Sequence, residues 1–140
     1  WVFAQSSGAP LACLMLDIDH FKRVNDDYGH AAGDAVLRQL ADVLKNASRA
    51  GDMVFRYGGE EFSAILTNAP LKIALQIGER IRTLVEKTDF VWESQRIPVT
   101  LSIGVAVATG TERDSQALIQ AADTALYEAK ESGRNRTVVG

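Results

Sequence analysis

An apolar run that ends in acidic residues, LACLMLDID at residues 11–19, constrains the fold of this chain more than any other segment. Its uninterrupted apolar part, residues 11–16, is typical of a central strand that is covered on both faces. Side chains alternate along a strand, so Asp17 and Asp19 are expected on one face and Ile18 on the other. The run therefore predicts a layered domain with carboxylates at the end of a buried strand.

Later segments carry the apolar periodicity of amphipathic helices. One begins at Asp34, one at Pro70, which suits a first helical turn, and one near Asp114 or Ser115. The last of them is expected to stop at Gly133. The expected buried stripes are Val36, Leu40, Val43 and Leu44 in the first helix, Ile73, Ile77, Ile81 and Leu84 in the second, and Leu118, Ala121, Ala122, Ala125 and Ala129 in the third.

Short runs rich in branched and aromatic residues predict further strands. These runs cover residues 52–56, 62–66, 90–92, 99–108 and 138–139. The first two flank a Gly-Gly pair, which is a good hairpin signal. A loop or broken turn is expected at residues 25–33, which are polar and contain glycine, and a turn is expected at residues 93–98.

The predicted elements follow the order strand, helix, hairpin, helix, strand, helix. This order indicates an α+β sandwich whose central, mainly antiparallel sheet is flanked by helices, with a ferredoxin-like βαββαβ core. In that topology the first strand lies beside the hairpin. The end of the first strand, at Asp17, and the turn at Gly58 and Gly59 are therefore expected to share one rim of the sheet.

Length and composition fit a single globular domain. The 140 residues are enough for a substantial core, and a hydrophobic share of 46% with a charged share of 24% is ordinary for a soluble protein. The net charge of −3 argues against a surface for duplex nucleic acid, which is normally basic. We therefore expect an anionic ligand to meet a local cluster of cations.

Other features bear on cellular location. The single cysteine, Cys13, has no disulfide partner and is expected to be a buried thiol in a reducing compartment. Residues 99–108 are too short to span a bilayer, and the chain opens without a basic and apolar leader. We expect a cytoplasmic protein with no membrane segment in this chain. Because the first strand follows closely after residue 1, we also expect an upstream portion to be missing.

The shared rim would gather acidic residues from two segments, Asp17 and Asp19 with Glu60 or Glu61, and Lys22 would lie beside them. Crowded carboxylates repel one another unless a cation lies between them. Mg²⁺ suits such a place because it takes few carboxylates and fills its other positions with water and phosphate oxygens. Taken separately, the aspartates also fit a strand-ending turn, and the glycines fit a tight turn.

The signature GGEEF at residues 58–62 follows Arg56 and Tyr57. Other notable segments are DIDHFKRVND at residues 17–26, GHAAGD at 29–34, SIGVA at 102–106 and ADTALYEAKESGRN at 122–135. Each is weak alone, but together and in this order they closely resemble the GGDEF-domain diguanylate cyclases. The resemblance covers nearly the whole chain. It implies one GGDEF domain at residues 1–140 and a sandwich of the palm or nucleotidyl-cyclase type.

The resemblance implies an activity and a metal site. The family condenses two GTP molecules into cyclic di-GMP and releases pyrophosphate. By analogy, Asp17, the main-chain carbonyl of Ile18 and Glu60 would hold Mg²⁺, for which Mn²⁺ is an alternative, and Glu60 and Asp17 would be the catalytic residues. Gly58 and Gly59 would let the backbone approach the substrate closely.

Substrate contacts also follow from the resemblance. It places triphosphate contacts at Lys22, Lys130 and Arg134, although cations at a helix end also fit favourable partners of the helix dipole. It places base contacts at Asn25 and Asp34. A carboxylate accepts the adjacent donors of guanine, whereas adenine would leave it unsatisfied. Without the resemblance, Asn25 fits a turn and Asp34 an N-cap.

A separate element implied by the resemblance is an inhibitory site for the product. Arg49 and Asp52 have the spacing RxxD, and Arg80 occupies the position of an assisting arginine. A guanidinium can donate two hydrogen bonds to the O6/N7 edge of guanine. The same spacing alone also fits a surface ion pair at a helix end.

The reaction needs two GTP molecules face to face, so the resemblance implies a homodimer, normally driven by an upstream regulatory domain. The family's first helix and its LTxLxNR-like stretch are expected to be absent here, and activity is expected to depend on concentration. A second hypothesis is a catalytically weak GGDEF domain that only binds cyclic di-GMP or GTP. A third, an unrelated ferredoxin-like interaction domain, leaves the acidic rim without a purpose.

Overall fold

Strand β1 (Leu11–Ile18) is the centre of the fold, and every one of its residues is buried. The computed structural model describes residues 9–108 and 115–140. The other described elements are α2 (Phe21–Tyr28), α3 (His30–Ala47), β2 (Met53–Gly58), β3 (Glu61–Thr67), α4 (Leu71–Lys87), β4 (Phe90–Trp92), β5 (Gln95–Ile97), β6 (Leu101–Ala108), α5 (Ser115–Glu131) and β7 (Arg136–Val139).

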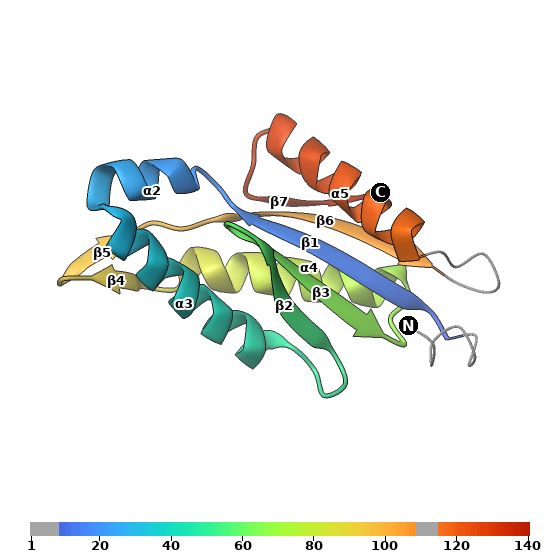
Figure 1. Ribbon diagram of the computed structural model, residues 1–140. Helices are drawn as coiled ribbons and strands as arrows, with labels where there is room; N and C mark the ends of the chain where they lie inside the picture. The colour runs from blue at the N-terminus through green and yellow to red at the C-terminus, as the bar shows by residue number, and fades with distance from the viewer. Residues whose placement is uncertain (1–8, 109–114) are drawn as a thin grey trace.

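The described strands form a main sheet in the order β2-β3-β1-β6-β7, while β4 and β5 form a separate hairpin. β1 is antiparallel to both of its neighbours, and only the β6–β7 pair of this described sheet is parallel. In Figure 1, α5 lies on one side of the sheet and α3 and α4 lie on the other. This arrangement confirms the predicted α+β sandwich with a ferredoxin-like core.

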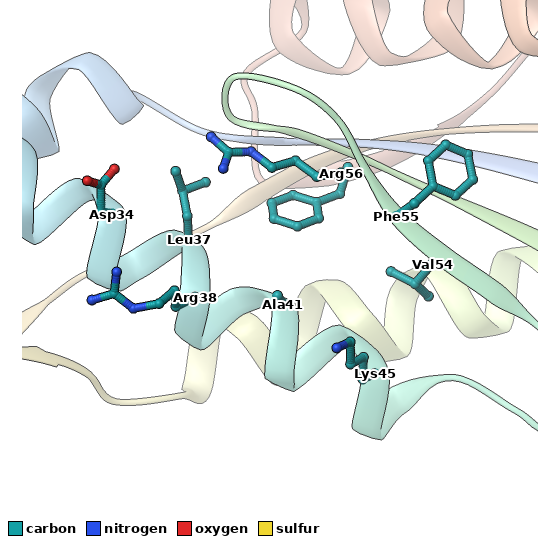
Figure 2. A pocket seen from close by; sticks show the side chains of 9 residues that line it. Asp34, Leu37, Arg38, Ala41, Lys45, Val54, Phe55 and Arg56 are labelled. Carbon is teal, nitrogen blue, oxygen red and sulfur yellow. The ribbon is translucent and has the colours of Figure 1, made fainter.

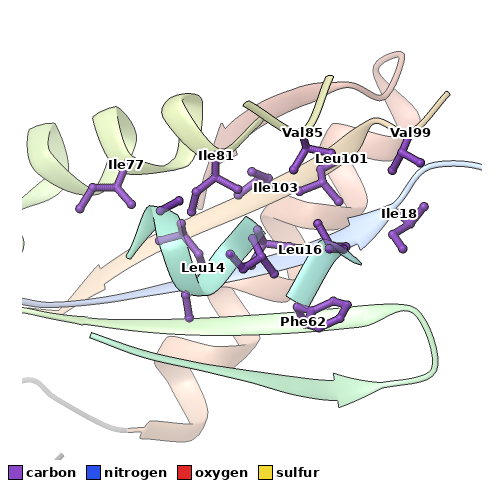
Figure 3. Close-up of a cluster of buried hydrophobic side chains, with 14 of the residues drawn as sticks. Leu14, Leu16, Ile18, Phe62, Ile77, Ile81, Val85, Val99, Leu101 and Ile103 are labelled. Carbon is purple, nitrogen blue, oxygen red and sulfur yellow. The ribbon is translucent and has the colours of Figure 1, made fainter. Parts of the chain in front are cut away.

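Alternate residues of β1 pack into two separate apolar clusters, one on each face of the sheet. This is why residues 11–16 of the strand are all apolar. Leu14, Leu16 and Ile18 pack in the larger cluster with α3 and α4. Cys13 and Met15 pack in the smaller cluster with α5. Figure 3 shows side chains of α4 and β6 turned toward those of β1 in the larger cluster. The sheet is therefore covered on both faces at its central strand.

The predicted loop at residues 25–33 is wrong. Its first part belongs to α2 and its last part to α3, and Gly29, with a φ of 95°, separates the two helices. The helix α2 buries only Val24, so its sequence shows little apolar periodicity. The following helix begins at His30, and Asp34 lies inside it rather than at its start.

The predicted turn at residues 93–98 is also wrong in part, because β5 occupies its second half. Glu93 and Ser94 both have positive φ, 49° and 66°, which is the backbone of a tight two-residue hairpin. Neither residue is the glycine or asparagine that usually marks such a turn, so these positions carry no hairpin signal.

The ends of α4 and α5 differ from their predicted patterns. Leu84 is 41% exposed, and the neighbouring Val85 is the buried residue at the end of the α4 stripe. The expected helix start at Asp114 lies outside the described residues. The described part of α5 begins at Ser115 and ends at Glu131, two residues before Gly133. No helix among the described residues is both long and apolar enough to cross a bilayer.

Candidate active site

The end of β1 lies beside the turn of the β2–β3 hairpin. In the antiparallel register Asp17 is paired with Glu61, so the preceding residue, Glu60, lies at the same rim. A pocket of about 190 Å³ opens there. It is lined by Asp17, Ile18, Asp19, His20, Phe21, Lys22, Glu60, Lys130 and Arg134. The structure thus brings together the two carboxylates and the three cations that the sequence singled out for metal and phosphate.

Asp17 is the most buried acid of this pocket, with 4% of its side chain exposed, and it forms an ion pair with Lys130. Burial raises the pKa of the Asp17 carboxyl to about 6. The hydrogen bond and charge of Lys130 act to lower this pKa, whereas the charges of Glu60 and Glu61 raise it further. The pocket therefore favours additional positive charge near Asp17.

The donor set at this rim fits a divalent cation that keeps most of its ligands from water or substrate. Asp17 and Glu60 supply carboxylates, and Ile18, between Asp17 and Asp19, lines the same pocket. Among the described residues no three acidic, histidine or cysteine side chains are close enough to hold a metal ion by themselves. A site with two carboxylates and free positions is what Mg²⁺ uses when it binds together with phosphates.

The three cations reach the pocket from different elements. Lys22 is on α2, its side chain is 91% exposed, and its Nζ lies 3.3 Å from Asp26. Lys130 is in the last turn of α5. Arg134 follows that helix with a positive φ of 64°, and its Nη1 lies 3.5 Å from the carbonyl oxygen of Lys130. Lys22 is thus exposed and pairs with a surface acid, whereas Lys130 is less exposed and pairs with buried Asp17.

The proposed base-binding residues lie next to each other on α2 and α3. A Cβ added at Gly33 would collide with Oδ1 of Asn25, so the Asn25 side chain packs directly against the residue before Asp34. Asn25 is helical and is not a turn residue, and Asp34 is not an N-cap, because α3 begins at His30. Both simple structural explanations are therefore excluded.

Asp34 also lines a second pocket, of about 460 Å³, between α3 and β2. Figure 2 shows Asp34 at one end of this pocket, with Arg38 on the same helix and Arg56 on the strand opposite. Leu37 and Phe62 supply apolar surface. An apolar slot with an acceptor at its end suits a flat base with ring N–H donors.

The signature glycines have free space around them. A Cβ added at Gly58 or Gly59 would meet no heavy atom within 4 Å, and neither residue has a positive φ. The turn is instead held by Arg56, whose Nε donates to the carbonyl oxygen of Gly59 at 2.9 Å. Folding of the hairpin therefore does not itself demand glycine at these positions.

A third pocket has a volume of about 610 Å³. It is lined by Arg49, which follows the end of α3, and by Arg80, which is within α4. Nε and Nη2 of Arg49 donate to Asp52 at 3.0 and 2.9 Å, and none of the Asp52 side chain is exposed. Arg80 donates to the carbonyl oxygen of Ala47. The RxxD pair is thus a buried-acid ion pair that fixes one arginine at the mouth of a pocket.

Sequence reasoning missed the contacts of Asp19. Its carboxylate accepts hydrogen bonds from Thr100 Oγ1 at 2.7 Å, Ser102 Oγ at 2.6 Å and the backbone N–H of Asn135 at 2.9 Å. The available signal was a pair of hydroxyl residues at the start of an otherwise apolar strand. Their partner depends on the β1–β6 register, which the sequence does not reveal.

The fold and the pocket define a ferredoxin-like α+β domain with a carboxylate and cation site at the end of its central strand. Residues 1–136 match the family described as "Diguanylate cyclase, GGDEF domain". The chain therefore belongs to the GGDEF family of diguanylate cyclases, as the motifs predicted.

Named relatives agree with this assignment. The chain is 44% identical over 129 residues to diguanylate cyclase A of Treponema denticola, and the match covers 92% of the chain but 35% of that protein. The GGDEF domain of DgcB from Caulobacter crescentus, solved in complex with c-di-GMP, has a TM-score of 0.91 and 33% identity, with 99% of this chain and 82% of that chain covered.

A second solved structure shares the signature variant. The active GGEEF domain of a diguanylate cyclase from Vibrio cholerae has a TM-score of 0.89 and 33% identity, with 99% of this chain and 87% of that chain covered. The chain spans about a third of the curated relative named above and most of these isolated domains.

Proposed function

We propose that this chain is a diguanylate cyclase that condenses two GTP molecules into cyclic di-GMP and two pyrophosphates. One observation carries the proposal. Asp17 and Glu60, far apart along the chain, line one pocket together with Lys130 and Arg134. A pocket that combines acids and cations suits a metal-bound triphosphate. Membership of the family and the names of its relatives support the same activity.

The metal would be Mg²⁺, or Mn²⁺ in its place, held by the carboxylates of Asp17 and Glu60 and the main-chain carbonyl of Ile18. When bound there, it would neutralise phosphate charge and make a sugar hydroxyl easier to deprotonate. Burial is the main cause of the raised pKa of Asp17, and the charges of Glu60 and Glu61 add to it. A bound cation would relieve the repulsion among these three acids, which supports this role.

The triphosphate would lie against Lys22, Lys130 and Arg134. Lys130 would exchange its ion pair with Asp17 for a phosphate oxygen, and exposed Lys22, which lines the same pocket, would bind a second phosphate oxygen. Such charge-assisted contacts position the α-phosphorus and hold the leaving pyrophosphate. The open space around Gly58 and Gly59 supports close passage of the phosphates over the hairpin turn.

Guanine would be held by Asn25 and Asp34. The carboxylate of Asp34 accepts hydrogen bonds from guanine N1–H and N2–H, whereas adenine N1 has no hydrogen to donate. Asp34 is exposed in the structure. A bound adenine would cover its carboxylate without donating a hydrogen bond to it, which is the basis for selecting GTP over ATP.

In each half-reaction the 3′-hydroxyl oxygen of one GTP bonds to the α-phosphorus of the other. The bond between that phosphorus and the β-bridging oxygen breaks, and pyrophosphate leaves. Glu60 would accept the hydroxyl proton. The described residues offer one set of phosphate and base contacts, so a second copy of the chain must bring the second GTP across a symmetric interface.

The deciding experiment incubates the chain at high concentration with GTP and Mg²⁺ and separates the products by chromatography. We expect cyclic di-GMP from the unchanged chain and from the surface control Glu128→Ala, and none from Glu60→Ala. Absence of the product, or an equal yield from Glu60→Ala, would contradict the proposal and favour a GGDEF domain that only binds nucleotides.

The pocket at Arg49 and Arg80 favours a second role, binding of the product as a feedback inhibitor. Two guanidinium groups at one pocket suit the guanine edges and phosphates of cyclic di-GMP. The complex of DgcB with c-di-GMP supports this role by analogy. In calorimetric titration with cyclic di-GMP, Arg49→Ala should bind at least tenfold more weakly, while Lys72→Ala, an exposed position in the first turn of α4 that does not line this pocket, should bind normally. Unchanged affinity in Arg49→Ala would remove this site.

A further inference from the structure

The two aspartates at the end of β1 have different surroundings. Asp17 faces Lys130 and the acids of the hairpin, where a ligand can approach. Both oxygens of Asp19 are occupied by groups of the chain itself. Oδ1 accepts from Ser102 Oγ, and Oδ2 accepts from Thr100 Oγ1 and from the backbone N–H of Asn135. Asp19 is therefore suited to holding structure and not to ligating a metal.

The backbone that Asp19 contacts is strained. Gly133, Arg134 and Asn135 have successive φ angles of 131°, 64° and 44°. Left-handed φ costs a non-glycine residue about 1 kcal/mol or more, although asparagine tolerates it better than most residues. Such a conformation persists only where several contacts determine it.

Several contacts converge on this turn. The N–H of Arg134 donates to the carbonyl oxygen of Ala129 at 2.9 Å, which closes the end of α5. The Asn135 side chain accepts from Arg82 Nη1 at 2.9 Å and donates to Glu86 at 2.6 Å, which ties the turn to α4. The hydrogen bond from the Asn135 N–H to Asp19 connects this turn to the residue that follows β1. Asp19 also lines the candidate active-site pocket.

The Asp19 contact also joins three segments that build the pocket. The backbone N–H of Asp19 donates to the carbonyl oxygen of Thr100 at 3.0 Å, so β1, the start of β6 and the turn after α5 meet at one buried carboxylate. Arg134 is one residue from the Asn135 N–H, and Lys130 is in the helical turn just before. A change in this turn would therefore redirect both cations.

We infer that Asp19 is a positioning residue, whose hydrogen bond to the Asn135 N–H fixes the left-handed turn and thereby aims Arg134 and Lys130 at the triphosphate. This inference rests on the proposed function for its kinetic consequence. Its structural core, that Asp19 holds the turn, is independent of any activity. Asp19 acts through the two cations and does not itself touch the substrate.

The chain offers a closely matched pair of variants. Asp19→Ala removes all three accepted hydrogen bonds. Asp19→Asn can keep them, because its amide oxygen accepts from Thr100 and Asn135 while its NH₂ group donates to Ser102 Oγ. We expect Asp19→Ala to raise the KM for GTP roughly tenfold with a smaller change in kcat, since phosphate binding is lost before the chemical step. Asp19→Asn should stay within about twofold of the unchanged chain.

A double-mutant cycle separates positioning from general damage. If Asp19 acts through Arg134, then adding Asp19→Ala to Arg134→Ala should raise the KM by less than about threefold beyond Arg134→Ala alone. The inference is overturned if the two effects multiply, if Asp19→Ala has normal kinetics, or if Asp19→Asn is as impaired as Asp19→Ala.

Hydrogen exchange followed by NMR tests the structural core without enzyme activity. The Asn135 amide should be protected in the unchanged chain and in Asp19→Asn, and should exchange at least tenfold faster in Asp19→Ala. The Ser132 amide, which donates to Glu128 within α5 at 2.9 Å, is the control and should not change. Fast exchange of Asn135 in the unchanged chain overturns the inference, even where Asp19→Ala fails to fold or the chain makes no cyclic di-GMP.

Discussion

Lys130 forms an ion pair with Asp17, and both residues line the pocket proposed to hold the triphosphate. The ammonium group occupies the side of Asp17 where positive charge is favoured. A metal-bound triphosphate would bring its own cation to Asp17 and its own anions to Lys130. The ion pair between Lys130 and Asp17 thus matches the charges that the proposed ligand would bring. Loss of this pair should lower the free energy of unfolding of the chain when no ligand is bound.

We predict that Lys130→Met destabilises the metal-free chain by about 3 kcal/mol near pH 8, because it leaves a buried carboxylate without its partner. Burial raises the pKa of Asp17 from its ordinary value of 3.8 to about 6. The folded chain therefore binds more protons than the unfolded chain between these values, and its free energy of unfolding falls as pH rises through them. Near pH 5 Asp17 is protonated in the variant, so the penalty should nearly vanish.

Urea unfolding at the two pH values, with a chelator present, measures this difference. Lys22→Met is the matched control, because Lys22 is exposed and its ion pair with Asp26 is at the surface. The control should change the free energy of unfolding by less than about 1 kcal/mol at either pH. A penalty for Lys130→Met that is independent of pH would show that lost packing, not the charge of Asp17, is responsible.

Residue identities at the site could be predicted because their chemistry is local. Carboxylates after a buried strand and a Gly-Gly turn pointed to Asp17 and Glu60, and the structure brings both to one pocket. The contacts of Asp19 could not be predicted in the same way. They depend on how β1, β6 and the turn after α5 meet, and that meeting is set by the whole sheet.

At the element scale, α5 packs closely against β6 at a glycine of the strand, Gly104. A Cβ added at Gly104 would collide with the backbone oxygen of Ala122 and the backbone nitrogen of Leu126. Both obstacles are main-chain atoms of a packed helix and cannot move aside as a flexible side chain would. Since α5 carries Lys130, the spacing at Gly104 also sets how close that lysine lies to the strand end.

We therefore predict that Gly104→Ala lowers the free energy of unfolding by about 3 kcal/mol, because α5 must shift away from the sheet. Gly59→Ala, in the turn between β2 and β3, is the control, since its Cβ would meet no atom within 4 Å. It should change stability by about 0.5 kcal/mol or less. Denaturant unfolding of the two variants checks the prediction, and equal stabilities would mean that α5 is not held at this distance.

The boundaries of elements were predicted best where apolar periodicity was strong. β1 and the α4 stripe at Ile77 and Ile81 follow their patterns closely. The pattern failed at α2, which buries only Val24 and so resembles a polar loop in sequence. It failed again at β5, whose hairpin turn uses two left-handed residues that are not glycine. In both places tertiary packing decides the structure over local preference.

At the scale of the whole molecule, the proposed product pocket and the candidate active site are separate pockets that share no lining residue. The α4 helix links them, because it carries Arg80 at the first and Arg82, which contacts the Asn135 turn, beside the second. The active-site rim is at the end of β1, and this strand begins at the opposite end of the sheet (Figure 1). The eight residues of β1 therefore separate the strand's start from the candidate active-site rim by about 25 Å.

The proposed reaction makes this chain half of an enzyme, so its rate should depend on how often two copies meet. If the dimer is a minor species, mass action makes the rate per chain proportional to concentration, and tenfold dilution should lower it about tenfold. Fusing a dimeric coiled coil upstream of β1 through a flexible linker should abolish this dependence and raise the rate at low concentration. The same fusion with charged residues at its a and d positions is the monomeric control.

A rate per chain that stays constant on dilution without any fusion would mean either a permanently associated dimer, visible by sedimentation, or a monomer that completes the reaction alone. The latter result would contradict the proposed two-copy mechanism.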